Sequence, residues 1–493
     1  MPRRLIRWCL LRLKRTLLLT SFLLVILTLV ICAFISLNQD HAQFNGIKAH
    51  LHGGKGLGPD THDVMLISKQ NRSRYSTLRP RQRPMVQFYP DNQNRLLYRK
   101  VEYLNDADVV VPLNLNVPDL DVKSTHSPLS TLSDSGPLCQ NCHVFYYAWY
   151  ANPVFDGSWR HWNHKYLPNW DQNDHRAAPR GSHDPEKFDI AANFYPQLGA
   201  YSSIDPEIIK KHMVLIKQSK IGVLVVSWYP PNFSDPNGSP VDNIIPILLD
   251  AAHTEGLKLT LHFEPYPGRN ISSVRRDLEY IHKKYVHSPA FYRTKQGKPM
   301  FYIYDSYLIS DMYRLLTPSG DMTIRSTKLD AIMIGLLVDF KDRLSLKASG
   351  FNGFYTYFGS NGFTYGASWK NWRGLATFAK KNSLLFIPSV APGYNDIRIR
   401  PWNGATTRLR RKGAYYDIAW RTLIELNLQY ASITSFNEWH EGTQIEPAVP
   451  MNTESFTYGS YEPFGPDFYI RKTREWIEKF FNSREMSEKN EIK

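Results

Sequence analysis

The sequence predicts an α/β protein: a (β/α)8 TIM barrel with extended loops, preceded by a single N-terminal transmembrane helix and a flexible stem. Three observations predict this architecture. Eight short apolar runs recur between residues 143 and 442, polar or helix-forming segments separate them, and a long uncharged apolar run lies near the N-terminus. An open doubly wound sheet is the alternative, but no glycine-rich phosphate turn follows the first run, which argues against it.

The N-terminal segment combines a basic tail with an apolar helix. Residues 1–15 carry six Lys and Arg side chains and no acid, and residues 16–37 are uncharged and largely apolar. A helix of this length crosses about 30 Å of hydrocarbon. Because basic flanks stay in the cytosol, we expect a retained signal-anchor with the remainder in the lumen. A cleaved signal peptide is the alternative, but the apolar run is long for one and no clear small-x-small cleavage site follows it.

Residues 38–138 carry scattered Pro, Ser, Asn and Asp with little periodicity, which predicts a flexible lumenal stem. Two D-x-D pairs lie in this segment, Asp106 with Asp108 and Asp119 with Asp121. Metal-dependent glycosyltransferases use such pairs. Their position before the first predicted strand instead favours solvated acids without a catalytic role.

Sequons and cysteines add two smaller observations. Asn71, Asn232 and Asn270 each begin an N-glycosylation sequon, which agrees with a lumenal location. Cys139 and Cys142 form a lone C-x-x-C pair with no second pair to complete a zinc site and no preceding βαβ context for a thioredoxin-like site. A small local disulfide and two free thiols are the alternatives for this pair.

The barrel domain is expected at residues 139–482, with a charged C-terminal tail at 483–493. Near-continuous apolar runs are typical of strands buried on both faces of a parallel sheet. The predicted strands are 143–150, 221–231, 257–266, 299–307, 330–340, 351–358, 384–394 and 430–442. Apolar residues at helical spacing predict helices at 204–220, 241–256 and 368–382.

Polar and aromatic side chains cluster at the C-terminal ends of the predicted strands. In a TIM barrel these ends meet at one face, where active sites lie. A carboxylate at the end of a buried strand is expected to be paired or functional, because an isolated buried charge is costly. These strand-end residues are Tyr147, Tyr150, Trp228, Tyr229, His262, Glu264, Tyr266, Asp305, Tyr307, Asp339, Tyr357, Glu438 and Glu441.

The fragment FNEWHEG, residues 436–442, holds two carboxylates three positions apart, Glu438 and Glu441. Two carboxylates beside aromatic residues point to glycoside hydrolysis, in which one acid protonates the leaving oxygen and the other drives attack. His440 between them is either a ligand contact or a structural hydrogen-bonding group. The aromatic content of 13% suits a protein that presents flat apolar faces to a sugar.

No metal, cofactor or nucleic acid is predicted. His161 and His164 lie three positions apart and His262 lies near Glu264, but neither pair forms a recognisable set of metal ligands. The formal charge of +15 comes partly from the N-terminal tail, and the remainder shows no dense basic cluster of the kind that binds nucleic acid.

Most of residues 143–450 closely resembles glycoside hydrolase family 99, the family of the eukaryotic glycoprotein endo-α-1,2-mannosidases. The N-terminal anchor is similar to that of the family's Golgi members, which implies a single-pass type II protein of the Golgi membrane with its barrel in the lumen. The matching stretches occur in order and include FYYAWY, HWNH, FYPQLGAYSSIDP, IGVLVVSWYPP, HFEPY, FYIYDSY, GFYTYF, NGFTYG, IPSVAPGY, IRPWN and SITSFNEWHEGTQIE.

The resemblance implies a retaining, endo-acting α-1,2-mannosidase that trims glucosylated high-mannose N-glycans on glycoproteins. It would release a saccharide of mannose carrying one to three glucose units. Glu438 would act as base toward the substrate's own 2-hydroxyl, giving a 1,2-anhydro sugar. Glu441 would act as general acid on the departing oxygen and then as base toward water.

The same motifs imply the substrate-binding residues. Trp228 would lie near the glucose-binding side, and Tyr147, Glu264 and Tyr357 would hold the mannose. His262, Asp305 and Tyr307 are further substrate-binding candidates.

Two functions of other classes compete with hydrolysis. A lumenal glycan-binding lectin would use the same fold without turnover, and the presence of both carboxylates argues against it. A type II membrane glycosyltransferase would share the membrane layout, and only that layout suggests it.

Overall fold

The computed structural model describes residues 88–90, 96–99, 136–169 and 179–491. The predicted cytosolic tail, the signal-anchor and most of the predicted stem lie outside these residues. Within the described part, no helix combines the length and the apolar character needed to cross a bilayer. Two short segments of the predicted stem, β1 (Phe88–Pro90) and β2 (Leu96–Arg99), pair as antiparallel strands.

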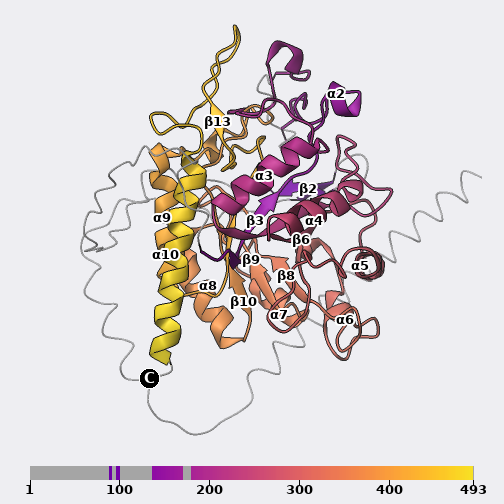
Figure 1. Cartoon of the computed structure of the whole chain (residues 1–493). Coiled ribbons are helices and arrows are strands. Elements are labelled where there is room, and N and C mark those ends of the chain that lie inside the picture. The colour runs from indigo at the N-terminus through magenta and orange to yellow at the C-terminus, as the bar shows by residue number, and fades with distance from the viewer. Residues whose placement is uncertain (1–87, 91–95, 100–135, 170–178, 492–493) are drawn as a thin grey trace, which may run out of the picture. The chain divides into compact units, whose positions relative to one another are not determined.

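One parallel sheet forms the centre of the barrel domain (Figure 1). Its strands follow one another in the order β10-β9-β8-β7-β6-β5-β3-β12-β11, and every neighbouring pair is parallel. The strands are β3 (Cys139–Tyr146), β5 (Ile221–Trp228), β6 (Lys258–Phe263), β7 (Met300–Ile303), β8 (Ile332–Leu336), β9 (Gly353–Tyr355), β10 (Leu385–Ile387), β11 (Ser389–Val390) and β12 (Ala431–Ile433).

The sheet closes on itself at an interrupted strand. Only Pro388 separates β10 from β11, so these two segments form one strand whose first half pairs with β9 and whose second half pairs with β12. Counted in this way, the ring has eight strands. Pro388 has no N–H to donate, which interrupts the ladder, but its carbonyl accepts the N–H of Ser432 at 3.1 Å. The structure is therefore a parallel barrel of the predicted (β/α)8 type.

A helix follows each strand of the ring. The predicted helices at 204–220, 241–256 and 368–382 correspond to α3, α4 and α8. Helices α9 and α10 lie side by side (Figure 1), and α10 continues through most of the predicted C-terminal tail. The helices are α2 (Pro153–Asp156), α3 (Pro206–Gln218), α4 (Ile245–Thr254), α5 (Ile271–Lys284), α6 (Met312–Leu316), α7 (Asp342–Ala348), α8 (Trp369–Lys381), α9 (Ala414–Ile424) and α10 (Phe468–Glu491).

Local sequence signals set where helices begin. The Asp205 carboxylate accepts the N–H of Glu207 at 2.9 Å, and Pro206 follows in the first turn of α3. At α5 the Asn270 carboxamide accepts two N–H groups of the first turn, and the Ser273 hydroxyl accepts the Asn270 N–H at 3.0 Å. These caps satisfy backbone N–H groups that a helix leaves unpaired at its start.

Aromatic side chains from strands that are not neighbours meet inside the ring. His143 Nδ1 lies 2.8 Å from the Tyr302 hydroxyl, and the Tyr302 ring packs edge-on against Tyr355 at 5.1 Å. Phe145 packs against Tyr355 and His262. All of these side chains are buried, so the interior is a filled core that supports the rim above it.

Several strands are shorter than predicted because their last residues leave the extended conformation. Asp305 has φ 48° and Tyr357 has φ 49°, which places both in the left-handed region beyond β7 and β9. The predicted strand at 430–442 is extended only as β12. In each case the residues past the strand build the rim that carries the predicted site.

Two details complete the domain. β4 (Tyr195–Pro196) pairs antiparallel with β13 (Ala448–Val449), which joins the long loop after β3 to the chain that follows β12. Cys139 and Cys142, at the start of β3, are buried and free, so the structure has the two-thiol alternative.

Candidate active site

Residues 434–446, which follow β12, form a compact loop that carries both predicted catalytic acids. We call this segment the acid loop. The N–H of Ser435 donates to the Thr443 carbonyl, and the N–H of Ile445 donates to the Ser435 carbonyl, both at 3.0 Å. The Ser435 hydroxyl accepts the N–H of Glu438 at 2.8 Å. These bonds close the loop on itself and fix the position of Glu438.

The acid loop is also tied to the end of β3. The Asn437 carboxamide accepts the N–H of Tyr147 and donates to its carbonyl, both at 2.8 Å. The Tyr150 hydroxyl donates to the Asn437 carbonyl at 2.9 Å and accepts the N–H of Trp439 at 3.0 Å. The acid loop, which follows the last strand of the ring, is therefore hydrogen-bonded to the chain that leaves the first strand. No sequence pattern singles out Asn437 for this role, although it lies inside FNEWHEG.

Glu438 and Glu441 lie close enough to influence each other's protonation. Glu438 is 3% exposed, and its Oε1 accepts the N–H of His440 at 3.1 Å. Burial and the charge of Glu441 raise the pKa of Glu438 well above its ordinary value. Burial raises the pKa of Glu441 to about 7, against the opposing charge of Arg400. Burial therefore favours the protonated form of both carboxyls, and the charge of Glu441 affects the titration of Glu438.

Glu441 is short of protein partners. Its Oε2 is buried and has no hydrogen-bond partner among the described residues. Its Oε1 lies 3.8 Å from Arg400, which also contacts Asp396 at 3.1 Å. A buried polar atom without a partner is costly, so it is expected where a ligand completes the site. Arg400 and Asp396 were missed as site residues, although Arg400 belongs to the IRPWN stretch.

Two phenols from opposite sides of the ring meet above the core. The hydroxyls of Tyr147 and Tyr357 hydrogen-bond to each other. Burial, with the charges of Glu438 and Glu441, raises the pKa of both phenols well above the ordinary value. Both phenols therefore stay protonated, and the hydroxyl that accepts in this bond can donate its own proton to a ligand oxygen. The structure brings these two predicted residues to the acid pair.

Glu264 and His262 form the next part of the rim. His262 Nδ1 lies 3.0 Å from Glu264 Oε1, and its Nε2 lies 2.5 Å from the Tyr355 hydroxyl. The charge of Glu264 helps to raise the pKa of Glu441, so the two carboxylates lie within electrostatic range. His262 supports Glu264 from the strand below, and Glu264 faces the acid pair.

Asp305 and Tyr307 lie on the far side of Glu264. The Tyr307 hydroxyl donates to Asp305 Oδ1 at 2.9 Å, and Arg269 donates to the Asp305 carbonyl at 3.1 Å. Burial raises the pKa of Asp305 to about 6, and Glu264 adds to the effect. Tyr307 is 42% exposed, so it stands at the outer edge of the rim.

The structure does not bring Trp228 to this rim. Its side chain is fully buried, its indole N–H donates to Asp242 Oδ1 at 2.8 Å, and its ring packs against Phe263. Asp242 lies just before α4, so the indole points out of the ring toward the helices. The prediction that Trp228 contacts the sugar is corrected here: Trp228 is a core residue.

His440 is a structural hydrogen-bonding group, one of the two alternatives left open by the sequence. Its Nδ1 lies 2.8 Å from the Ala191 carbonyl, and its Nε2 lies 3.1 Å from His161 Nδ1. Both ring nitrogens are therefore used within the protein.

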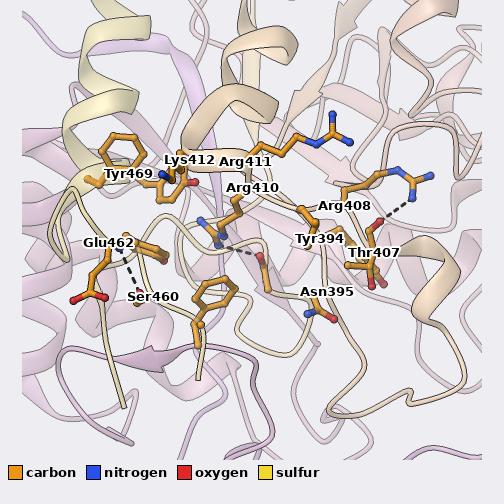
Figure 2. Close-up of a pocket in the computed structure, with 16 residues that line it drawn as sticks. Tyr394, Asn395, Thr407, Arg408, Arg410, Arg411, Lys412, Ser460, Glu462 and Tyr469 are labelled. Carbon is orange, nitrogen blue, oxygen red and sulfur yellow. Dashed lines mark hydrogen bonds between the residues drawn. The ribbon is translucent and has the colours of Figure 1, made fainter. Parts of the chain in front are cut away.

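A cavity of about 270 Å³ lies behind the acid loop (Figure 2). Neither Glu438 nor Glu441 lines it, but Gly442 and Asn395 do. Arg410 crosses from this cavity to the loop and donates to the carbonyls of Gly442 at 3.0 Å and Gln444 at 2.7 Å. Its guanidinium lies between aromatic rings. Arg410 thus holds the back of the acid loop.

No group of three or more His, Cys, Asp or Glu side chains within the described ranges is arranged to hold a metal ion. The chemistry that the described rim offers is proton transfer between a bound substrate and two neighbouring acids, with phenols placed to bind sugar oxygens. Two carboxyl groups at the C-terminal rim of a TIM barrel are typical of a glycoside hydrolase.

Comparison with known proteins gives the family. The family model Glycosyl hydrolase family 99 matches residues 137–482. The chain is 48% identical to the Mus musculus Glycoprotein endo-alpha-1,2-mannosidase over 359 residues, which are 72% of this chain and 78% of the relative. It is 41% identical to the Xenopus laevis protein of that name over 478 residues, 96% of this chain and 98% of the relative.

A solved structure agrees with these sequence matches. The GH99 endo-alpha-mannosidase from Bacteroides thetaiotaomicron is 43% identical, with a TM-score of 0.66, over 71% of this chain and 99% of its own. The chain belongs to glycosyl hydrolase family 99, and it is a glycoside hydrolase.

Proposed function

We propose that this enzyme is a retaining, endo-acting α-1,2-mannosidase that trims glucosylated high-mannose N-glycans and releases a glucosyl-mannose saccharide. The observation that carries the proposal is the pair Glu438 and Glu441, whose pKa values burial raises, beside the phenols of Tyr147 and Tyr357. The linkage follows from similarity to relatives named Glycoprotein endo-alpha-1,2-mannosidase.

In the first step the substrate supplies its own nucleophile. Glu438 takes the proton of the mannose 2-hydroxyl while that oxygen attacks C1. Glu441 gives its proton to the glycosidic oxygen, and the bond from C1 to that oxygen breaks. The product is a 1,2-anhydro sugar. In an α-mannoside the axial 2-hydroxyl lies opposite the leaving group, so it is placed for this attack.

The surroundings of the two acids suit these roles. The His440 N–H, 3.1 Å from Glu438 Oε1, stabilises the ionised form that a base needs. The pKa of Glu441, raised to about 7, keeps part of this acid protonated near neutral pH. Arg400, 3.8 Å away, then stabilises the carboxylate that remains after proton transfer.

In the second step water opens the anhydro ring. The Glu441 carboxylate takes a proton from a water molecule, whose oxygen attacks C1 from the face that the leaving group has left. The Glu438 carboxyl returns its proton to O2. Two successive inversions at C1 give a product with the original α configuration.

The rim residues hold the mannose for these steps. Tyr147 and Tyr357 stay protonated, and the hydroxyl of this pair that is not used in their mutual bond donates a hydrogen bond to a sugar oxygen. Glu264 accepts hydrogen bonds from sugar hydroxyls and is oriented by His262. Asp305 and Tyr307 contact the substrate further out. No metal ion or cofactor takes part in the proposal.

The test is to incubate the full-length protein with a glucosylated Man9 glycan and weigh the released saccharide by mass spectrometry. We expect a mannose bearing every glucose unit of the substrate, released first as the α anomer by NMR. Binding without release would indicate a lectin. Product formation that required a sugar nucleotide and Mn²⁺ would indicate a glycosyltransferase.

We also propose that the protein is a single-pass type II protein of the Golgi membrane with its barrel in the lumen. The basic residues 1–15 before the apolar residues 16–37 support this topology. Asn232 and Asn270 are both exposed on the folded domain. We expect glycan mapping to find an N-glycan on at least one of them and protease to spare the barrel in intact microsomes. Cleavage of the barrel under those conditions would contradict the topology.

A further inference from the structure

A second group of titratable side chains lies beside the acid loop and takes no part in the steps above. His161 belongs to the long loop after β3, and Asp235 belongs to the loop after β5. They are 3% exposed, and His440 of the acid loop is 4% exposed. His161 Nδ1 lies 3.1 Å from His440 Nε2, and His161 Nε2 lies 3.0 Å from Asp235 Oδ1. One imidazole ring therefore links three loops of the rim.

The hydrogen bonds fix the protons on His440. The Ala191 carbonyl can only accept, so His440 Nδ1, 2.8 Å away, carries a proton. Burial and the neighbouring His164 and His161 lower the pKa of His440 well below its ordinary value, so this ring is neutral. Its Nε2 is then an acceptor, and the donor across the 3.1 Å contact is His161 Nδ1.

The other nitrogen of His161 is a donor as well. Asp235 accepts the N–H groups of Asn237 at 2.6 Å and Ser239 at 2.9 Å. These bonds and His161 outweigh the effect of burial and lower the pKa of Asp235, so its carboxylate is ionised and can only accept. His161 Nε2 must therefore donate to it. With both nitrogens protonated, His161 is an imidazolium cation.

The aromatic neighbour of His161 suits a cation. The Trp149 ring is stacked on the imidazole at 4.3 Å between centroids, with 9° between the planes. A cation over the face of an indole is stabilised by the negative charge density of the ring. Trp149 also packs against Tyr147, so the stack continues to the predicted sugar-binding phenol.

We infer that His161 is a positioning residue for the hydrolysis: as a buried imidazolium held by Asp235, it locks the His440 ring and with it the main-chain N–H that Glu438 accepts. The link to the reacting group is the 3.1 Å bond from the His440 N–H to Glu438 Oε1. The His440 N–H held in this way favours the ionised form of Glu438, which is the form that a base needs. This inference rests on the proposed role of Glu438.

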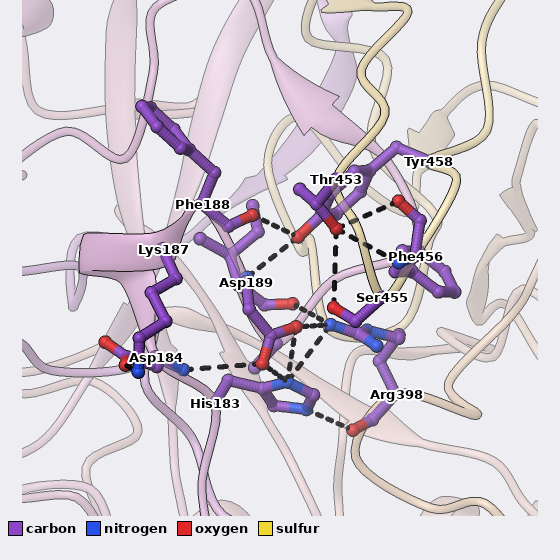
Figure 3. Close-up of polar contacts among 12 residues, drawn as sticks. His183, Asp184, Lys187, Phe188, Asp189, Arg398, Thr453, Ser455, Phe456 and Tyr458 are labelled. Atoms are coloured by element: carbon purple, nitrogen blue, oxygen red, sulfur yellow. Dashed lines mark hydrogen bonds and ion pairs between the residues drawn. The ribbon is translucent and has the colours of Figure 1, made fainter.

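The acceptor on the other side of His440 is anchored independently (Figure 3). Arg398 pairs with Asp189 and donates to the Ile190 carbonyl at 3.1 Å, and His183 contacts Asp189 at 3.1 Å. The Ile190 N–H donates to the Tyr458 hydroxyl at 2.8 Å. The next residue in the chain is Ala191, so its carbonyl is presented to His440 from a fixed segment.

The protonation of His161 is tested directly on the unmodified enzyme. Full-length protein labelled with nitrogen-15 in its histidines is examined by NMR, and the His161 signals are assigned by their absence from His161→Gln. We expect both ring nitrogens of His161 to have imidazolium shifts and attached protons at neutral pH. A single protonated nitrogen would overturn the inference, whether or not the enzyme is active.

The positioning role is tested with two substitutions and one control. His161→Phe keeps a ring beside Trp149 but removes both donors, and we expect kcat to fall about tenfold to a hundredfold with little change in KM. His161→Gln restores donors without the charge, and we expect it to recover part of kcat. His253→Gln is the control, because His253 is exposed on α4 and lies outside the chain of contacts to Glu438.

The pH profile separates positioning from a merely structural role. The titratable groups that face His161 are Asp235, His440, His164 and Tyr150. A displaced His440 N–H in His161→Gln should raise the pKa of Glu438 and move the acidic limb of kcat/KM to higher pH, while His253→Gln keeps the wild-type limb. An unmoved limb in His161→Gln, or a lowered Tm with normal kcat in His161→Phe, contradicts the role. If Glu438→Gln were fully active, the proposed function itself would fail instead.

Discussion

Two glutamates of the acid loop, five positions apart, have opposite surroundings. Glu446 is fully buried, its Oε1 lies 3.1 Å from His212 Nε2, and its Oε2 accepts hydrogen bonds from Tyr201 at 2.9 Å and Trp439 at 3.0 Å. Glu441 has one buried oxygen with no partner among the described residues, and Arg400 is 3.8 Å from the other. The first carboxylate has its hydrogen-bonding capacity filled by the protein, and the second leaves capacity for a ligand.

This difference teaches how to recognise a working acid in a buried loop. Burial alone does not distinguish the two residues. The count of satisfied lone pairs does, because a structural carboxylate is stable only when the protein supplies its donors. Substitutions at these carboxylates and at their partners test this difference.

The largest effect is expected from Glu441→Gln. The amide cannot give a proton to the leaving oxygen, so we expect kcat on the glucosylated glycan to fall about a hundredfold to ten-thousandfold. Glycan affinity, measured by calorimetry, and the Tm should change little, because Glu441 makes few bonds within the protein. Near-normal turnover in this variant would contradict the role of Glu441 as general acid and the proposed functional difference from Glu446.

Glu446→Gln should do the opposite. It removes the carboxylate oxygen 3.1 Å from buried His212 Nε2 or turns an amide donor toward a donor, so we expect a loss of about 3 kcal/mol in the free energy of unfolding. Urea denaturation measures this loss. Folded protein should keep kcat within about tenfold, since Glu446 does not touch the substrate in the proposal. Glu475→Gln on the exposed face of α10 is the control and should change neither quantity. Abolished turnover with unchanged stability would contradict a structural Glu446.

Arg400→Gln should change the pH dependence of hydrolysis through the pKa of Glu441. Arg400 opposes the rise in the pKa of Glu441, so its removal raises that pKa further. Hydrolysis needs protonated Glu441 and falls as pH rises through its pKa, so the basic limb of kcat/KM should move to higher pH by about half a unit to one unit. Arg408→Gln is the control, because Arg408 bonds the carbonyls of Asn361 and Thr407. A shift to lower pH would reverse the assigned role.

The smallest effect is expected from Trp228→Phe. Asp242 is a second satisfied carboxylate, with donors from Trp228 at 2.8 Å, Tyr280 at 2.7 Å and Tyr285 at 2.8 Å. Removing one donor should cost about 1 kcal/mol of stability. Thermal unfolding reports this cost, and kcat/KM for the glycan should stay at the wild-type value. A large loss of glycan affinity would instead support the prediction that Trp228 contacts the sugar.

The fold is largely predictable because strands buried on both faces appear in the sequence as unbroken apolar runs. The same property explains the error at Trp228. All eight residues of β5 are buried, so the sequence shows no alternation to tell which side chains point into the ring and which point toward the helices. Tyr147, Glu264 and Tyr357, which the strand-end rule selects, lie in the structure near the acid pair and stay predicted substrate-binding residues.

The missed residues come from long loops. Arg400 and Asp396 lie between β11 and α9, and Asp235 lies between β5 and α4. Loops have no period from which side-chain direction can be read, so no pattern in the sequence places them beside the acid pair. From the sequence, His161 is recognisable only as part of an unsuitable pair of metal ligands. Its partner His440 is 279 positions away, so their contact cannot be read from the sequence.

The interruption at Pro388 has a consequence for local opening of the barrel. β11 and β12 are in register over two residue pairs, and β12 and β3 over three, whereas β5 and β6 are in register over six. The pairing beside Glu438 and Glu441 is therefore short, as is the pairing of β6 with β7 over two residue pairs. A brief local opening at β11 and β12 would disturb the acids directly, so catalytic competence should be lost on heating before the fold itself.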